Sequence, residues 1–174
     1  LATQKDASGK VNWELKHCSR CLNEAELYIF NAGPEPVVVF LERFDDSMLN
    51  DIRKNYDYSK LYVEDPLHAF VISGIYCTGS DFTDNKYNIV IPDLSECSEY
   101  KIVGAIYKPG AKSYSPYASL TLPKTLIFIG EKAFYGVESI TVMPFDGIGI
   151  DEDIYIGDEA FANCSGLTSV SLPT

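Results

Sequence analysis

A six-residue pattern, I-G-x-x-A-F, occurs twice in the chain and constrains its fold more than any other feature. The copies, residues 129–134 (the first block) and residues 156–161 (the second block), lie 27 residues apart. Recurrence at a fixed period predicts an array in which each unit covers the apolar face of its neighbour. Because arrays of this kind commonly bind ligands on an extended surface, the pattern indicates an architecture and a class of function, but no particular ligand.

The spacing of apolar triplets around the blocks suggests a unit that has been altered twice. An uninterrupted unit would have 23 residues, 7 from Leu122 to Ile129 and 16 from Ile156 to Leu172. That length falls within the roughly 20–29 residues of leucine-rich repeats. On this interpretation, one copy has lost three residues after its Phe, and an insertion of seven residues lies within residues 143–153.

Residues 137–142 and 167–172 match the L-x-x-L-x-L strand signature of leucine-rich repeats. Their inward side chains, together with the Ala and Phe of each block, would form one continuous core. The glycine of each block suits a tight corner, where a side chain would collide or φ must be positive.

These residues resemble the BspA-like leucine-rich repeat proteins, whose units read approximately L-P-x-x-L-x-x-I-G-x-x-A-F-x-x-C-x-x-L-x-x-V-x-L-P. The similarity is close over about residues 120–174 and weaker from about residue 87. It implies a β-rich leucine-rich-repeat solenoid segment with one strand and a short helical or 3-10 turn per unit. It also implies a bacterial, secreted or cell-surface protein similar to adhesins and without catalytic residues. The matching positions are Leu122, Pro123, Leu126, Ile129, Gly130, Ala133, Phe134, Ile156, Gly157, Ala160, Phe161, Cys164, Leu167, Val170, Leu172 and Pro173.

Residues 1–86 are predicted to form a separate small module, α+β or mainly β, before an array over residues 87–174. Alternating apolar residues at 11–15 predict a half-buried strand, and the apolar run at 37–41 predicts a strand buried on both faces. One helix is expected near residues 46–56, where apolar residues recur at spacings of three and four.

Further strands are expected at residues 61–63 and 69–72, a turn-rich stretch from residue 74 and a loop at residues 108–117. The chain stops at the end of a predicted strand, where an array should carry a polar cap. The array is therefore expected to be truncated from a longer one, or to shield its last repeat by self-association.

The net charge argues against one class of partner, and the length of the apolar runs argues against a membrane-spanning segment. A formal net charge of −11 and a pI of about 4.5 argue against nucleic acid, which needs clustered Lys and Arg. The sequence has no apolar run of 18 or more residues, so no transmembrane segment is expected.

Cysteines and histidines provide no clear chemical site. Cys18 and Cys21 could form a local disulfide, remain thiols, or join a long-range bridge with Cys77 or Cys97. A metal site would need further ligands, and Cys164 matches a core position of the repeat. With no catalytic constellation either, we expect a non-enzyme without cofactor or metal.

The outward positions of the predicted repeat strands align into columns, one of which is serine throughout at residues 119, 139 and 169. If the strands are parallel, these positions form a solvent face of the kind that repeat proteins use for binding. The simpler alternative is that small hydroxyl residues merely suit an exposed, curved sheet. The candidate ligand-binding residues are Glu138, Ser139, Thr141, Thr168, Ser169 and Ser171.

The leading functional prediction is an exported or cell-surface protein that binds a protein or glycan on the repeat surface. A first alternative makes the array a structural spacer that presents a ligand-binding N-terminal module. A second alternative places an enzymatic or thiol-active function in that module, with the repeats serving for targeting.

Overall fold

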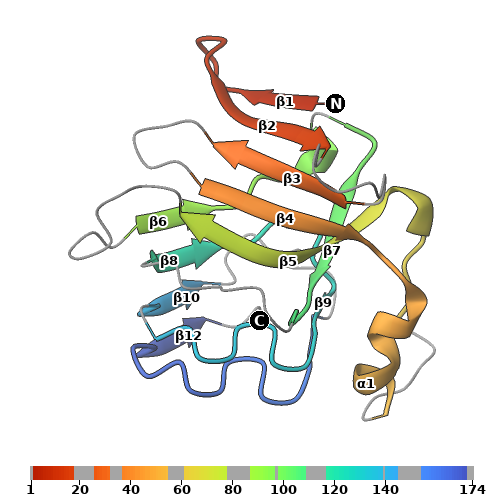
Figure 1. Cartoon of the computed structure of the whole chain (residues 1–174), viewed down its shortest axis with the longest axis vertical. Helices are drawn as coiled ribbons and strands as arrows, with labels where there is room; N and C mark the ends of the chain where they lie inside the picture. The colour runs from red at the N-terminus through yellow and green to blue at the C-terminus, as the bar shows by residue number, and fades with distance from the viewer. Residues whose placement is uncertain are drawn as a thin grey trace.

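The computed structural model describes residues 2–17, 26–31, 37–54, 61–77, 87–96, 98–108, 117–138, 140–144 and 154–171. The described strands form two sheets on either side of an apolar core (Figure 1). The first five strands are β1 (Ala2–Lys5), β2 (Val11–His17), β3 (Glu26–Asn31), β4 (Val37–Arg43) and β5 (Ala69–Cys77). The remaining strands are β6 (Tyr87–Val90), β7 (Lys101–Ala105), β8 (Tyr117–Thr121), β9 (Phe128–Ile129), β10 (Val142–Pro144), β11 (Tyr155–Ile156) and β12 (Ser169–Ser171).

The larger sheet has eight strands in the order β1-β2-β3-β4-β5-β7-β9-β11. Its strands from β1 to β5 pair antiparallel, whereas β5, β7, β9 and β11 pair parallel to one another. The smaller sheet has four parallel strands in the order β12-β10-β8-β6. From β6 onward the chain passes alternately between the two sheets, so each pass adds one parallel strand to each of them.

The predicted fold class, a β-rich leucine-rich-repeat solenoid segment preceded by a small α+β or mainly β module, is wrong. The chain forms a mixed eight-stranded sheet that takes strands from both sides of residue 86. The physical reason is the parallel pairing of β7 with β5, which joins the N-terminal antiparallel strands to the repeats through backbone hydrogen bonds. Each repeat also contributes strands to two sheets, and hydrogen-bonded turns replace the expected helical segment.

Apolar alternation explains why β2 and β4 form. Trp13 and Leu15 are buried on one face of β2, as expected for a half-buried strand. In β4 the buried residues are Val37, Val39 and Leu41. The prediction that this run is buried on both faces is wrong, because the opposite face of β4 is open enough to leave Phe40 36% exposed.

A short helical segment covers part of the outer face of the larger sheet. It consists of a 3-10 turn, η1 (Asp46–Leu49), followed by α1 (Asn50–Arg53). The Asp45 side chain accepts a hydrogen bond from Ser47 N at 2.9 Å and so caps the turn. The buried side chains of Leu49 and Ile52 pack in an apolar cluster with residues of β5, β7 and β9.

Three further segments differ from expectation. Residues 61–63 form no strand, although Leu61 is buried in the cluster beneath α1. β5 continues to Cys77, beyond the expected turn at residue 74, and the described part of the loop expected at 108–117 includes Tyr117, which begins β8. Two short 3-10 turns, η3 (Pro66–His68) and η4 (Leu94–Glu96), precede β5 and β7.

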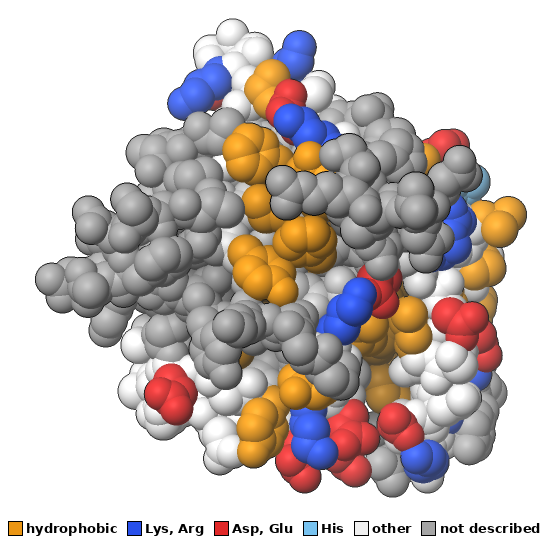
Figure 2. All heavy atoms as spheres, viewed as in Figure 1, with side chains coloured by type: hydrophobic (Ala, Val, Ile, Leu, Met, Phe, Trp, Pro, Cys, Tyr) orange, Lys and Arg blue, Asp and Glu red, His pale blue; other side chains and the backbone are white. Residues whose placement is uncertain are grey.

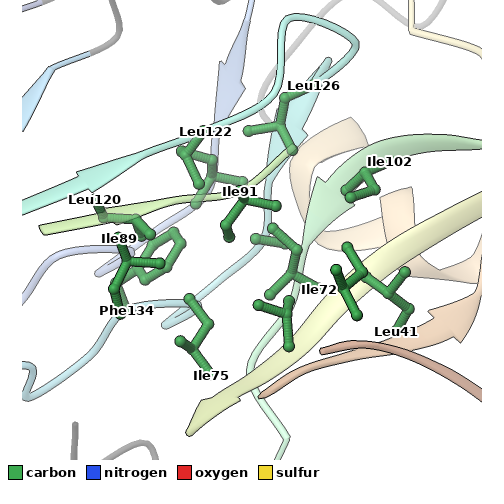
Figure 3. Close-up of a cluster of buried hydrophobic side chains, with 14 of the residues drawn as sticks. Leu41, Ile72, Ile75, Ile89, Ile91, Ile102, Leu120, Leu122, Leu126 and Phe134 are labelled. Atoms are coloured by element: carbon green, nitrogen blue, oxygen red, sulfur yellow. The ribbon is translucent and has the colours of Figure 1, made fainter. Parts of the chain in front are cut away.

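The main core lies between the two sheets (Figure 3). Side chains from the smaller sheet and the segments that follow its strands meet side chains from the larger sheet there, and Phe134 of the first block joins them. The labelled members are Leu41, Ile72, Ile75, Ile89, Ile91, Ile102, Leu120, Leu122, Leu126 and Phe134. Burial of these side chains from both sheets stabilises the face-to-face arrangement.

Candidate functional site

The two blocks are stacked on each other with a constant offset of 27 residues. Ile129 pairs with Ile156 between β9 and β11, and Val142 pairs with Ser169 between β10 and β12. The backbone also joins the blocks directly: Lys132 N donates to Asp158 O (3.0 Å), Phe134 N to Ala160 O (2.8 Å) and Gly136 N to Ala162 O (2.9 Å). The interpretation as a 23-residue unit altered twice is therefore wrong for this pair.

Each block has the same backbone conformation. Lys132 and Glu159 both have a left-handed φ, of 56° and 54°, and Gly136 and Asn163 follow with φ of 71° and 59°. Such values strain residues that carry a Cβ, although Asn tolerates them better than most. The glycine that follows Ile156 is required for another reason. A Cβ on Gly157 would lie 2.6 Å from Glu131 N, so this glycine permits the close approach of the two blocks.

Corresponding apolar side chains differ in burial between the blocks. Ile129, Phe134 and Ile140 are 0%, 4% and 0% exposed. Their counterparts 27 residues later, Ile156, Phe161 and Leu167, are only partly buried. The rings of Phe134 and Phe161 are stacked, with centroids 5.6 Å apart and planes within 2°. The second block therefore covers the first.

Four of the six predicted binding residues can be placed with their side chains. Glu138, Thr168 and Ser169 are exposed, and Thr141 is half-buried. Thr141 and Thr168 are neighbours, because Thr168 N and Oγ1 each donate to Thr141 O at 3.0 Å. Ser139 and the side chain of Ser171 lie outside the described part of the chain.

The observed strand register changes which residues align in the columns expected from the sequence. Ser119 pairs with Val142, and Val142 pairs with Ser169, so Val142 takes the place expected for Ser139 in the serine column. On the neighbouring strand β6, Val90 pairs with Thr121 and is 56% exposed. The outer face of the smaller sheet thus combines short hydroxyl side chains with an exposed valine.

A second candidate surface lies on the outer face of the antiparallel strands, where hydrophobic side chains gather in the middle of the view in Figure 2. Tyr28, Phe40 and Tyr76, from β3, β4 and β5, form what we call the aromatic strip. The Phe40 ring centroid lies 6.3 Å from that of Tyr28 and 5.2 Å from that of Tyr76, the latter pair edge-to-face at 87°. Aromatic side chains in such an exposed position are frequent centres of protein interfaces.

Charged side chains lie next to the strip on β2. Lys16 Nζ lies 5.1 Å from the ring centroid of Phe30 and 2.7 Å from a carboxylate oxygen of Glu14. The hydrogen bond to Glu14 raises the pKa of Lys16 above its usual value, so Lys16 is charged at neutral pH. An apolar centre with a charged rim is the usual composition of a protein-binding patch. The sequence-based predictions missed this strip, because Phe40 lies in a run expected to be buried on both faces and Tyr76 in a stretch expected to be turn-rich. The alternation of Tyr28 and Phe30 was a usable signal.

A small hollow separates the ends of β5 and β7 from the first block. It measures about 30 Å³, and its polar lining includes Ser73, Tyr107 and Lys108. Ser73 Oγ reaches Phe40 O at 3.4 Å, and Lys108 forms an ion pair with Glu42. This volume accommodates about one water molecule, so the hollow is too small for an organic substrate.

Of the cysteines, only Cys164 can be described with its side chain. It is buried, its Sγ donates to Phe134 O at 3.0 Å, and burial raises the pKa of the thiol above its ordinary value of 9.0. It occupies the position in the second block that Val137 occupies in the first. Cys18, Cys21 and Cys97 and the side chain of Cys77 lie outside the described residues.

The described residues contain neither a metal-binding cluster nor a membrane-spanning helix. No cluster of three or more His, Cys, Asp or Glu side chains in this part of the chain is arranged to hold a metal ion. Among the same residues, no helix has the length and apolar character needed to cross a membrane.

Comparison with known proteins identifies no relative. No protein-family model matches the chain, and searches of curated proteins and of solved structures found no match.

Proposed function

We propose that this chain is a non-catalytic interaction protein, exported or displayed at a cell surface, that binds a protein or glycan ligand on the outer face of its smaller sheet. The observation that carries this proposal is the exposure of that face, where Val90 is 56% exposed and Ser169 is exposed. Short side chains on parallel strands leave a shallow surface on which an extended ligand can lie. The resemblance of the I-G-x-x-A-F blocks to BspA-like repeats supports the exported location.

A second candidate function is ligand binding by the N-terminal strands, with the stacked repeats acting as a spacer. The aromatic strip specifically favours this candidate, because its three rings lie in β3, β4 and β5 and Phe40 is exposed at its centre. On this account the ligand is a protein, since edge-to-face rings offer no flat platform for a sugar ring but can enclose an apolar side chain.

One pair of variants distinguishes the two candidates. Thr121→Lys together with Ser169→Lys places two bulky charges on the outer face of the smaller sheet, whereas Phe40→Lys replaces the centre of the aromatic strip. Each protein is tested on glycan and extracellular-protein arrays. A loss of binding of at least about tenfold, or about 1.4 kcal/mol, only in the double variant supports the first candidate. The same loss only in Phe40→Lys supports the second, and unchanged binding in both contradicts both proposals.

A further inference from the structure

The aromatic strip belongs to a larger apolar patch on the outer face of the larger sheet. Strand register pairs Phe30 with Val38 and Val38 with Tyr76, and the neighbouring row pairs Tyr28 with Phe40. Together with Phe30 and Val38, the strip forms what we call the outer patch. Phe40 is 36% exposed, and the other four side chains are partly exposed. Figure 2 shows hydrophobic side chains reaching the surface in this part of the molecule.

The apolar character of this face is unusual for a sheet that faces water. On an antiparallel sheet with one solvated face, apolar residues on the inner side alternate with polar residues on the outer side. In β4, Val37, Val39 and Leu41 are buried on the inner face, yet Val38 and Phe40 on the outer face are apolar too. Such a run is typical of a strand that is covered on both faces. The sequence of β4 therefore suits a complex in which a partner covers the outer patch.

The chain itself shows how this face of the sheet is covered farther along. There η1 and α1 pack against residues of β5, β7 and β9, and their side chains Leu49 and Ile52 are 0% and 1% exposed. Phe44, the residue after the end of β4, belongs to the same cluster. The outer patch thus lies on the same strand as a surface that a short helical segment already covers.

The position and size of the outer patch also suit a helix. β3 and β4 are each paired on both sides, so a ligand meets the patch face-on and cannot add a strand to it. A sheet face is covered by helices or by a second sheet. The patch spans three strands, about 10 Å, and extends about 7 Å along them. A helix is about 10–12 Å wide with its side chains, so two to three turns cover it.

The charges beside the outer patch are already paired with each other. Lys16 forms an ion pair with Glu14 on β2, and Lys108 forms one with Glu42 on β4. Neither pair leaves a single uncompensated charge for a ligand to neutralise. The centre of the patch therefore favours apolar groups over charged ones.

We propose that the outer patch binds an amphipathic helix of a partner protein, with the apolar stripe of the helix over Phe40. This inference rests on the second candidate function and specifies which element of the partner the aromatic strip recognises. Apolar side chains at spacings of three and four residues form a stripe on one face of a helix. Laid on the outer patch, that stripe completes the burial of the aromatic rings, as in other complexes in which an amphipathic helix docks through its apolar face.

The test selects peptides of about 14 residues on the intact chain from two libraries of equal composition. Apolar residues recur at spacings of three and four in the first library and alternate in the second. We expect binders from the first library, with a gain of helical circular dichroism on binding. In the wild-type chain, binding should shift the ring resonances of Tyr28 and Tyr76, a measurement that does not depend on the folding of a variant.

Phe40→Lys should weaken the binding of the selected peptides at least about tenfold. The matched control is Tyr62→Lys, which replaces an aromatic residue that is 65% exposed and lies outside the outer patch. Because surface residues outside a contact contribute little to binding, the control should change the affinity less than about twofold.

The outcomes separate this proposal from the function on which it rests. Binders that depend on Phe40 but come only from the alternating library would replace the helix with an extended ligand and leave the second candidate function intact. Binders from neither library, or binders indifferent to Phe40→Lys, overturn the proposal. Binders that Thr121→Lys with Ser169→Lys abolishes instead would support the first candidate function. A dimer of the chain alone that Phe40→Lys dissociates would make a second copy the occupant, which also overturns the proposal.

Discussion

In the first block Phe134 is 4% exposed, whereas in the second block the corresponding Phe161 remains partly exposed. The two residues occupy equivalent positions in two turns of the same backbone conformation. The left-handed positions recur as well, at Lys132 and Glu159. Local sequence therefore determines the conformation of each block, because the same pattern produces the same turn twice. Burial, in contrast, depends on what lies next to a block: the second block covers the first, and no described residue covers the second to the same extent.

The largest expected effect concerns the two phenylalanines. Phe134→Ala should lower the free energy of unfolding by about 3–5 kcal/mol, because it leaves a cavity in a closed core. Phe161→Ala should cost about 1–2 kcal/mol, because its partly exposed site loses less contact. Urea denaturation measures both. Both variants lose the same ring stack, so any difference between them reports burial, and equal costs would contradict the comparison.

Replacement of the two block glycines by alanine should also have unequal costs in stability, and here the larger cost falls in the second block. A Cβ on Gly157 would lie 2.6 Å from Glu131 N and 2.8 Å from Gly130 C, and backbone atoms in the stack cannot move easily. Gly157→Ala should therefore lower the free energy of unfolding by about 1–3 kcal/mol. Gly130→Ala is the control, because its nearest contact is Ala105 O at 3.2 Å, and it should cost less than about 1 kcal/mol. The reverse order in thermal unfolding would show that the blocks do not approach as described.

Relief of backbone strain should give a smaller effect of opposite sign. Lys132→Gly removes the Cβ from a residue with φ of 56° and should raise the free energy of unfolding by about 0.5–1 kcal/mol. Lys132→Ala is the control, since it removes the charge and retains the Cβ. Chemical denaturation that ranks Lys132→Gly no higher than Lys132→Ala would argue against a left-handed residue at this position.

The smallest effect involves Cys164 and is pH-dependent. Because the folded state raises the thiol pKa, the unfolded state loses its proton first, and stability should fall as pH rises above the ordinary value of 9.0. Cys164→Val introduces the residue found at the corresponding position of the first block, Val137, and should remove this contribution. The check is unfolding of both proteins between pH 7 and pH 10. Identical slopes above pH 9 would show that the thiol is not protected by burial.

Local patterns predicted individual elements better than their assembly. Alternating apolar residues in β2 and the Ile-Gly pairs at 129 and 156 each have a local cause, so the strand and the recurring turn could be anticipated. The register of the repeats could not be predicted. The pattern L-x-x-L-x-L can be placed on the apolar residues around Ile140 in two registers, which differ by three residues. In the structure, β9 with β11 and β10 with β12 pair at the 27-residue spacing, not in the register that aligns residues of the same type.

Pairing between strands that are distant in the sequence was still harder to predict. Nothing in residues 69–77 or 101–105 indicates that these segments pair in parallel, yet this contact produces the mixed eight-stranded sheet and overturns the predicted fold class. The aromatic strip was missed for a related reason. An apolar run such as residues 37–41 does not reveal which of its faces another layer covers, and here Phe40 remains on the open face.

Amide hydrogen exchange at a low, monomeric protein concentration tests most directly the claim that the second block covers the first. The amides of Lys132, Phe134 and Gly136 donate to carbonyl oxygens of the second block and should exchange slowly, at a rate set by opening of the stack. The amides of Glu159 and Asn163, at corresponding positions, should exchange at least about tenfold faster. Equal protection of the two sets would contradict the account, because it would mean that the second block is covered as completely as the first.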